Sequence, residues 1–523
     1  MASDDDPSTV DRNPGSETVV DRFSDWARRA GDRPFLSAGE ENQHFTYREF
    51  DEDTDRLAHR LLRTGVAPGQ RVGVYAESAL LCARAMFACW KLGAVYCPIN
   101  SQLREDLLAG MIDDLQPHAI IVGAEAMEPL GAVTSKLTHR EAALILFDGQ
   151  TPASRVEGMT PTDDQQGDLG RFDGFAGRVG EQPTPVGVEI GSDTVCSIMY
   201  TSGTTRRPKG VMHTHRWLSG LGATLGHMTH PDDVIYSDLP LYHIGGAYTN
   251  VVRAAWAGAS VALWNRFSAS NFWRRIDQAR PSIVTMLDVM LDRLWAAPPS
   301  RTERENSIIR VHMQPLRRRH AEVAKRFGID FVCVGYGSTE VGVAFTGLID
   351  EFGDTQATPK DLWKGFDKAE IGQRVIELAG KGAVIGPRKA PAGFMGAPVA
   401  HIHPRLEHSE GGEGAAQLSL RAGAPFVLSN AYFNDGAARE MMLGDGYFRT
   451  GDLVRQVKGG AYAFLERQEG MLRIRGENVS AVAIEEIIEA HASVLRCAVV
   501  GVPAAQGAED DIAAFVVMRS DAP

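Results

Sequence analysis

Residues 195–212 read VCSIMYTSGTTRRPKGVM. An apolar run leads into a hydroxyl-rich turn, which a lysine and a glycine close before two further apolar residues. Small residues let backbone N–H groups approach a phosphate, hydroxyls donate further hydrogen bonds, and lysine adds a mobile positive charge. The stretch predicts a polyphosphate-binding loop and differs from the G-x-x-x-x-G-K-[ST] loop in its spacing. An ordinary polar surface loop is the alternative. The predicted phosphate-binding residues are Thr201, Ser202, Gly203, Thr204, Thr205 and Lys209.

Helical and strand-like patterns alternate along the rest of the chain. RVGVYAES at 71–78 is typical of a strand, and ALLCARAMFACWKLGA at 79–94 is typical of a buried helix. The same alternation returns at 118–124, 142–149 and 283–295. Strands that alternate with helices predict an α/β fold with a largely parallel sheet. Residues 150–192 have no clear period and predict a connecting stretch.

Composition limits the class of protein. A chain of 523 residues is too long for one core and predicts two or more domains. The net charge of −13 argues against general binding to nucleic acid or to an anionic membrane. Residues 1–17 are acidic and polar, which predicts a disordered lead-in rather than a signal peptide. No apolar stretch is long enough to span a bilayer, and the six cysteines form no C-x-x-C pair, so we expect a cytoplasmic protein.

The stretch YTSGTTRRPKGVMHTH resembles the signature loop of the adenylate-forming superfamily, which includes acyl- and aryl-CoA synthetases. Arg206 stands where that family usually has glycine. Carnitine and crotonobetaine CoA ligases look similar in tolerating a residue other than glycine at that point. The resemblance runs from FTYREFDEDTDRLAHRLLRTGVAPGQRVGVYAES near the start to RIRGENVSAVAIEEIIEA near the end. It implies a large multi-layer N-terminal domain over 18–468, which binds ATP and acid. It also implies a small, mobile α+β C-terminal domain over 469–523.

Two further motifs fit this resemblance. PLYHIGG contains His243, which by resemblance lines the acid pocket, although a histidine beside an aromatic ring is often structural. GYGSTE is similar to a family segment in which the residue matching Tyr336 packs beside adenine and that matching Thr339 reaches the α-phosphate. Glu340 then matches the magnesium ligand, and Mg²⁺ does prefer one or two carboxylates together with phosphate oxygens. A helix cap is the alternative role for Glu340.

The resemblance continues in YFRTGD. Asp452 matches the carboxylate that accepts hydrogen bonds from both ribose hydroxyls, a role that suits an acceptor-only group. Arg467 matches an arginine that contacts ribose and phosphate. Glu469 stands at the family's hinge, and Gly476 matches the glycine that lines the tunnel for the CoA thiol. Read alone, each of these stretches could be only a turn.

These matches predict an enzyme that uses ATP and Mg²⁺ to adenylate a small carboxylic acid and then transfers the acyl group to CoA. Transfer to an amine, and adenylation of nitrite as in ATP-dependent diazotases, are alternatives within the same chemistry. A nucleotide-binding pseudoenzyme is a third alternative. The identity of the acid and the oligomeric state stay open, a homodimer included.

Two further features depart from the resembling family. Its members usually continue to a P-x-[ST]-x-x-G-K segment whose lysine assists adenylation, and the sequence reaches Pro523 without one, so we expect an incomplete C-terminal domain or another route to the adenylate. The stretch 348–395 is longer than the usual connection and predicts one or two amphipathic helices between Pro359 and Gly380. It could cover the acid pocket or pack peripherally.

Overall fold

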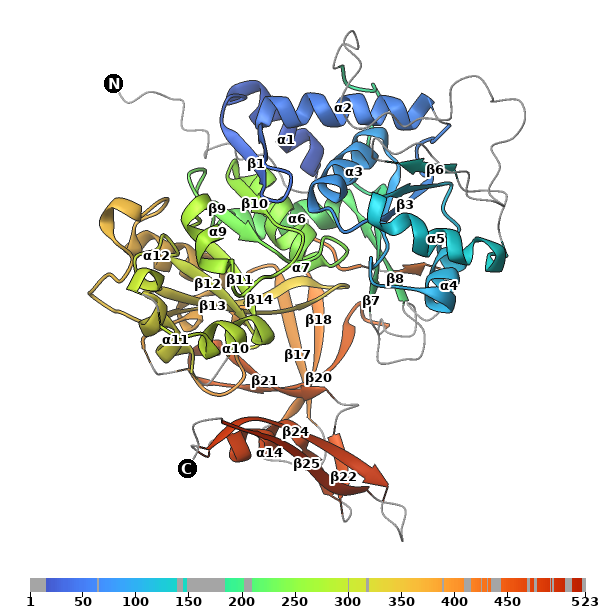
Figure 1. Ribbon diagram of the computed structural model, residues 1–523. Coiled ribbons are helices and arrows are strands. Elements are labelled where there is room, and N and C mark those ends of the chain that lie inside the picture. The colour runs from blue at the N-terminus through green and yellow to red at the C-terminus, as the bar shows by residue number, and fades with distance from the viewer. Residues whose placement is uncertain are drawn as a thin grey trace.

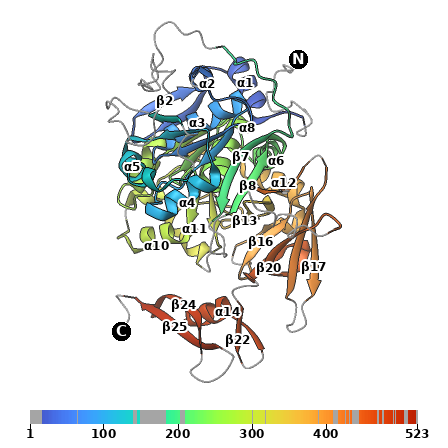
Figure 2. The ribbon, with the colours of Figure 1, turned by 90° about the vertical axis from the view of Figure 1, so that its right-hand side faces the viewer.

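The computed structural model is shown in two views at right angles in Figures 1 and 2. It describes residues 16–63, 65–138, 144–147, 184–201, 209–299, 301–316, 319–387, 390–408, 415–424, 426–429, 431–433, 444–467, 471–474, 477–489, 491, 493–503 and 510–519.

The larger sheet has a parallel half and an antiparallel half. Its strand order is β17-β18-β20-β21-β16-β14-β13-β12-β11-β9-β10-β1-β2, with β15 beside β14. Strands β13, β12, β11, β9, β10 and β1 run parallel, while β2 and the strands from β14 to β17 pair mainly antiparallel. The strands are β1 Pro34–Ala38, β2 Gln43–Thr46, β9 Val234–Ser237, β10 Ser260–Leu263, β11 Ile283–Leu287, β12 Arg310–Gln314, β13 Phe331–Ser338, β14 Gly342–Asp350, β15 Val384–Ile385, β16 Phe394–Pro398, β17 Ile402–His408, β18 Ala416–Ala422, β20 Phe448–Gln456 and β21 Tyr462–Arg467.

The second sheet has the order β19-β8-β7-β4-β3-β5-β6. Five of its strands, from β7 to β6 along that order, are parallel, and β8 and β19 extend the sheet antiparallel. Its strands are β3 Arg71–Tyr75, β4 Val95–Pro98, β5 Ala119–Val122, β6 Leu144–Phe147, β7 Val195–Thr201, β8 Lys209–Thr214 and β19 Tyr432–Phe433.

Helices fill the space between the sheets and cover their outer faces. Every residue of α3 is buried, as expected for a helix that is apolar on all sides. Helices α4 and α5 share a core with the outer face of the second sheet, and α9 packs Phe272 against Tyr236 of the first sheet at a ring distance of 5.6 Å. The helices are α1 Val19–Arg29, α2 Tyr47–Arg63, α3 Ala79–Leu92, α4 Glu105–Leu115, α5 Met127–Val133, α6 His215–Gly226, α7 Ile244–Gly246, α8 Arg253–Ala257, α9 Phe272–Ala279, α10 Asp288–Ala296, α11 His320–Phe327, α12 Lys368–Ala379 and α14 Ala481–Glu489.

The predicted α/β class is confirmed, and the predicted strand at 71–78 and buried helix at 79–94 appear as β3 and α3. The expectation of one largely parallel sheet is wrong, because the parallel strands divide between two sheets. Strand periodicity does not reveal this division. The sheet to which a strand belongs depends on pairing between distant segments, such as Leu36 with Val261. Most of the predicted connecting stretch, 150–183, lies outside the described residues, and 184–192 form neither helix nor strand.

The last part of the chain forms a small separate lobe in both views. Strands β22 Met471–Ile474 and β23 Glu477–Ser480 form one hairpin, and β24 Val494–Pro503 and β25 Asp510–Met518 form another. Helix α14 packs on the second hairpin through Ala481, against Cys497 and Val499. An ion pair joins Arg496 of this lobe to Asp292 of α10. This arrangement agrees with the predicted α+β character of the C-terminal part.

The predicted helix between Pro359 and Gly380 is α12, which is preceded by one 3₁₀ turn at Lys360–Leu362. Asp367 caps its first turn, and Ile371 and Val375 are buried. The segment before α12 is anchored where Asp330 accepts hydrogen bonds from the backbone N–H groups of Ala357 and Thr358. Asp330 immediately precedes β13, so this anchor lies at the amino end of the parallel strands. The phosphate- and ribose-type residues of the site lie at the other end.

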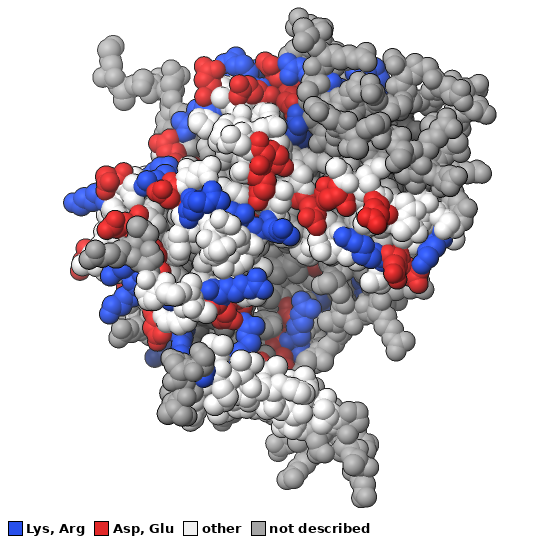
Figure 3. All heavy atoms as spheres, viewed as in Figure 1, with Lys and Arg blue, Asp and Glu red and all other residues white. Residues whose placement is uncertain are grey.

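In the part of the chain that the structure describes, no helix is long and apolar enough to cross a membrane. Figure 3 shows acidic and basic side chains interspersed over one face of the molecule.

Candidate active site

The predicted nucleotide-binding residues come from strands and turns of both sheets. Tyr336 lies near the end of β13, and Thr339 and Glu340 form the turn into β14. Asp452 lies in β20, and Lys209 opens β8 of the second sheet. Backbone passes very close behind the turn: a Cβ on Gly337 would lie 1.8 Å from the carbonyl oxygen of Gly342, so only glycine fits there.

Asp452 is held between an aromatic hydroxyl and an arginine. The hydroxyl of Tyr336 donates a hydrogen bond to Asp452 Oδ2, and Arg467 Nε lies 3.7 Å from Asp452 Oδ1. Asp452 and Arg467 are register partners in β20 and β21. Desolvation raises the pKa of Asp452, which is only 7% exposed, while Tyr336 and Arg467 oppose the rise and Glu340 adds to it. The Asp452 carboxylate is a sheltered hydrogen-bond acceptor beside the ring of Tyr336. This arrangement suits a pair of neighbouring hydroxyls on a sugar that carries a planar base.

Glu340 is fixed on both its side chain and its backbone. Ser338 and Tyr432 each donate a hydroxyl hydrogen bond to the carboxylate, both at 2.7 Å. The carbonyl oxygen of Glu340 accepts from Trp217 Nε1 at 3.2 Å and from the Ser429 N–H at 2.9 Å. The side chain therefore has a defined position before any ligand binds.

The preceding residue, Thr339, is held through its backbone. His213 Nε2 lies 2.7 Å from the Thr339 carbonyl oxygen and donates to it. Burial lowers the pKa of His213 to about 4, so the ring is neutral at physiological pH. Within the described residues, the buried Nδ1 of His213 has no hydrogen-bond partner.

Lys209 reaches the same place from the second sheet. Its ammonium nitrogen lies 5.2 Å from the ring centroid of Tyr432, the residue whose hydroxyl binds Glu340. Strand β19 places Tyr432 opposite Val211 of β8. Tyr432 thus connects the predicted phosphate-binding lysine with the predicted metal-binding carboxylate, and sequence reasoning did not identify it. No spacing or charge pattern around Tyr432 marks it, because its partners are more than ninety residues away.

The phosphate loop is described only at its two ends. Thr201 at the end of β7 pairs with Lys209 at the start of β8, so the two residues face each other at the mouth of the loop. The other loop residues, Ser202, Gly203, Thr204 and Thr205, lie outside the described residues, as do Glu469 and Gly476.

His243 precedes a continuous helical segment formed by α7, the π-helical turn η5 Ala247–Val252 and α8. Its ring lies 4.5 Å from that of Tyr242, and desolvation by neighbouring atoms lowers its pKa. A Cβ on Gly246 would lie 2.5 Å from the carbonyl oxygen of Pro240, which explains the glycine at this bend. The described contacts do not join His243 to Glu340 or Asp452. π-Helical turns are frequent at functional sites.

The residues present fit a magnesium ion that arrives with nucleotide. No group of three or more His, Cys, Asp or Glu side chains among the described residues could hold a metal on its own. Mg²⁺ needs fewer protein ligands when phosphate oxygens and water complete its octahedron. Glu340, with its carboxylate already oriented, supplies one such ligand.

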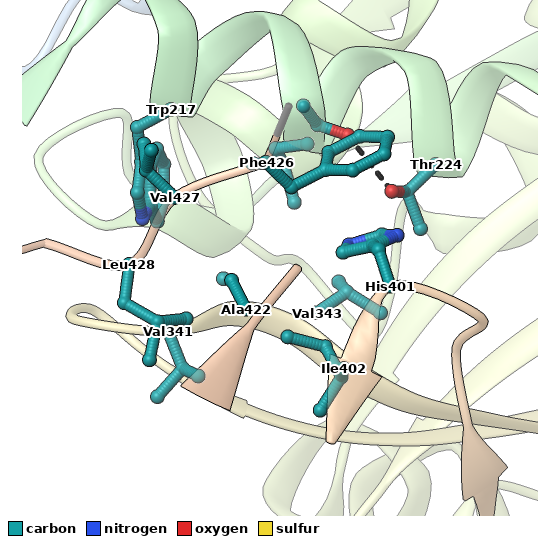
Figure 4. A pocket seen from close by; sticks show the side chains of 13 residues that line it. Trp217, Thr224, Val341, Val343, His401, Ile402, Ala422, Phe426, Val427 and Leu428 are labelled. Atoms are coloured by element: carbon teal, nitrogen blue, oxygen red, sulfur yellow. Dashed lines mark hydrogen bonds between the residues drawn. The ribbon is translucent and has the colours of Figure 1, made fainter. Parts of the chain in front are cut away.

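A small apolar cavity adjoins the turn at Glu340 (Figure 4). Trp217 and Thr224 of α6 face Val341, Val343 and Ile402 across it, and the Thr224 hydroxyl donates back to its own helix at Gly220. The ring of His401 stacks on that of Phe426 at 3.7 Å. This cavity is a packed joint between α6 and the antiparallel strands, and it offers a substrate few polar contacts.

Comparison with known proteins identifies the family of this chain. Residues 23–366 match the family described as AMP-binding enzyme. The chain is 26% identical to the crotonobetaine/carnitine–CoA ligase of Escherichia fergusonii over 92% of this chain and 85% of that protein. Among solved structures, the anthranilate CoA ligase AuaEII with anthranoyl-AMP superposes with a TM-score of 0.74 at 20% identity, covering 97% of this chain and 88% of that one. The ATP-bound MatB of Rhodopseudomonas palustris superposes with a TM-score of 0.73 at 22% identity, covering 98% and 90%. The chain therefore belongs to the family of AMP-binding enzymes.

Proposed function

We propose that this enzyme is an ATP-dependent acid–CoA ligase that works through an acyl-adenylate. The family, the relatives named as CoA ligases and the fold shared with ligases bound to ATP or to an acyl-AMP all support this proposal. The observation that carries it is the convergence of Lys209, Tyr432 and Glu340 from two sheets at one strand edge, in the same region as Asp452.

In the first step, a carboxylate oxygen of the acid attacks the α-phosphorus of ATP. The bond from that phosphorus to the bridging oxygen breaks, and pyrophosphate leaves with the electron pair. The protein has to align the reactants and stabilise the charge that moves, which is a positioning and electrostatic task. Mg²⁺ on Glu340 would neutralise phosphate charge when it is bound. Lys209 and the loop from Thr201 to Thr205 hold the phosphates, and Thr339 lies beside the α-phosphate.

The nucleoside part of ATP would lie between Tyr336 and Asp452. Asp452 accepts hydrogen bonds from the ribose hydroxyls, Arg467 contacts ribose and phosphate, and Tyr336 packs beside adenine. His243 lies at the acid pocket. In this orientation, hydrogen bonds from ribose to Asp452 replace the bond that Tyr336 donates to Asp452 or add to it.

In the second step, the thiol of CoA loses its proton to solvent and its sulfur attacks the acyl carbon. The bond from that carbon to the phosphate oxygen breaks, and AMP leaves with the electron pair as the thioester forms. The C-terminal domain, from Glu469 onward, rotates about its hinge between the two steps and places Gly476 beside the thiol. CoA is thus a co-substrate, and a small acid that binds beside His243 is the other substrate.

Two measurements test the proposal. Exchange of labelled pyrophosphate into ATP, in the presence of a panel of acids and Mg²⁺, reports the first step. Release of AMP with CoA, compared with an arylamine or with nitrite plus an arylamine, reports the acceptor. Acid-dependent exchange followed by thioester formation supports the proposal, and exchange that leads only to an amide or a diazo product contradicts the CoA step.

A further inference from the structure

The turn that carries Glu340 is held through its backbone by residues of β8 and α6, which belong to the other sheet and the helix after it. His213 Nε2 donates to the Thr339 carbonyl at 2.7 Å, and Trp217 Nε1 donates to the Glu340 carbonyl at 3.2 Å. These two carbonyl groups belong to the two planar peptide units on either side of the Glu340 Cα atom. Holding both units fixes the backbone torsions of Glu340, and with them the direction in which its side chain leaves the backbone.

The two donor rings are packed tightly. The ring of His213 lies on that of Trp217, with centroids 4.0 Å apart. The ring of Tyr248, in the π-helical turn η5, packs against both at 5.6 and 6.0 Å. His213 and Tyr248 are fully buried, and Trp217 is 3% exposed. A Cβ on Gly342 would lie 3.2 Å from Trp217 Cζ2, so the indole also packs against the backbone that follows the turn. Neither donor can rotate away without disturbing this cluster.

The strand that supports the turn also carries the phosphate-binding lysine. Lys209 and His213 are four residues apart in β8, so their side chains leave the same face about 13 Å apart. The Thr214 side chain accepts a hydrogen bond from the Trp217 N–H and starts α6 directly after the strand. Trp217 is thereby brought beside His213. One short stretch of chain thus links Lys209 to the support of Glu340.

His213 has a buried nitrogen that its packing does not satisfy. Donation from Nε2 of the neutral ring leaves Nδ1 as an acceptor, and within the described residues this buried atom has no hydrogen-bond partner. A buried acceptor without a partner destabilises a fold. An aliphatic side chain would avoid that cost but would take the donor away from the Thr339 carbonyl. The donor, rather than packing, explains a histidine here.

We propose, on the basis of the ligase function above, that His213 and Trp217 are positioning residues for the adenylation step. They act through the backbone of Thr339 and Glu340, so that the Glu340 carboxylate meets the magnesium of Mg-ATP already oriented. The hydroxyls of Ser338 and Tyr432 then have only the end of the side chain to orient.

Nucleotide binding with and without magnesium tests the proposal apart from turnover. Calorimetry gives the Kd of a non-hydrolysable ATP analogue in Mg²⁺ and in EDTA, and the ratio of the two values measures how much the metal strengthens binding. His213→Leu should reduce this ratio about tenfold, because a loosely held carboxylate has to be ordered on binding. Trp217→Phe keeps the aromatic ring, and the Ser429 N–H still holds the Glu340 carbonyl, so the reduction should be about threefold. His213→Gln retains a donor and should retain most of the ratio.

Two controls separate positioning from a general loss of stability. Trp26→Phe removes an indole N–H that donates to the Trp256 carbonyl at 3.1 Å from a residue that is 4% exposed, and it should leave the ratio unchanged. In a Glu340→Gln background, His213→Leu and Trp217→Phe should change the ratio no further, because the group that they position is gone. Tm shows that each variant is folded, and the magnesium dependence of acid-dependent pyrophosphate exchange should follow the same order.

The outcomes separate the two proposals. The positioning role is overturned, and the ligase function left standing, if the ratio is unchanged in both His213→Leu and Trp217→Phe, or falls equally in the Glu340→Gln background. A fall in His213→Gln as large as in His213→Leu, or in Trp26→Phe as large as in Trp217→Phe, overturns it too. If His213→Leu does not fold, Trp217→Phe and its Glu340→Gln background decide. Absence of AMP formation from the unchanged protein with every acid overturns the ligase function, whatever the ratios show.

Discussion

Replacing Asp452 with asparagine should weaken ATP binding without destabilising the protein at neutral pH. The side chain is nearly buried, and the Tyr336 hydroxyl can donate to an amide oxygen as it does to the carboxylate. The ion pair with Arg467 is lost, but that side chain is 63% exposed and the 3.7 Å contact is screened, so its loss costs at most about 1 kcal/mol.

The pH dependence follows from the raised pKa of Asp452. As pH rises, the unfolded chain loses this proton near its ordinary value of 3.8, before the folded protein does. The contribution of Asp452 to stability is therefore fully present below pH 3.8 and is lost as pH rises through the folded pKa. Asparagine has no such proton. The free energy of unfolding of Asp452→Asn, relative to the unchanged protein, should increase from pH 4 toward pH 7.

Binding should respond in the opposite direction. A hydrogen bond to a charged acceptor contributes roughly 1.5–3 kcal/mol, so loss of the charge should raise the Kd for ATP about tenfold to a hundredfold. Calorimetric titration with a non-hydrolysable ATP analogue measures the Kd, and urea unfolding at pH 5 and pH 7 measures stability. Tyr336→Phe is the companion variant: it leaves the sheltered carboxylate short of a donor and should destabilise the protein by about 1–3 kcal/mol. If Asp452→Asn lost as much stability as Tyr336→Phe and bound ATP normally, Asp452 would be a structural residue.

Further variants test the other parts of the site. Glu340→Gln should lower AMP formation about a hundredfold, because one electrostatic contact to the reacting phosphates is lost. If the variant and the unchanged protein showed the same rate of AMP formation at every magnesium concentration, Glu340 would not be the magnesium ligand. Tyr432→Phe keeps the ring beside Lys209 but removes the hydroxyl that binds Glu340, so AMP formation should fall about tenfold. Lys209→Ala should lower AMP formation about a hundredfold. Equal losses in the two variants would show that the hydroxyl and the ammonium group act as one unit. The pKa of His213 is about 4 when folded and 6.5 when unfolded, so the unfolded chain takes up this proton first as pH falls, and stability should decline between pH 6.5 and pH 4 by up to about 3 kcal/mol. His213→Gln retains a donor for Thr339 and should flatten that decline in urea unfolding.

Local sequence patterns predict the elements of this protein well, because helix and strand periods depend on near neighbours. The run from Ala79 to Leu92 is apolar on every side, and the helix is buried on every side. The same patterns cannot predict how strands are shared between sheets. That depends on pairs such as Tyr96 with Ser197, which lie about a hundred residues apart.

Motif residues can be identified individually, but their contacts cannot be predicted from their positions. The resemblance singles out Tyr336 and Asp452 for separate roles toward adenine and ribose. The structure adds that one donates a hydrogen bond to the other. Arg253 and His312 share a hydrogen bond but belong to no motif, and their sequence separation of 59 residues carries no signal. Their pairing becomes visible only when the helical segment lies across β12.

Tyr432 shows most clearly why the sequence motifs do not identify every residue of the site. Along the chain, β19 falls between β18 and β20, which are neighbours in the first sheet, yet β19 pairs with β8 of the second sheet. The chain thus leaves one sheet, adds a short strand to the other and returns. On the way, Ser429 donates its N–H to the Glu340 carbonyl and its hydroxyl to the Met212 carbonyl at 2.8 Å, and Tyr432 binds the Glu340 carboxylate. Because Lys209 and Glu340 belong to different sheets, the distance between them depends on how the sheets are joined. This excursion of the chain joins them at the point where both residues would meet the same phosphates.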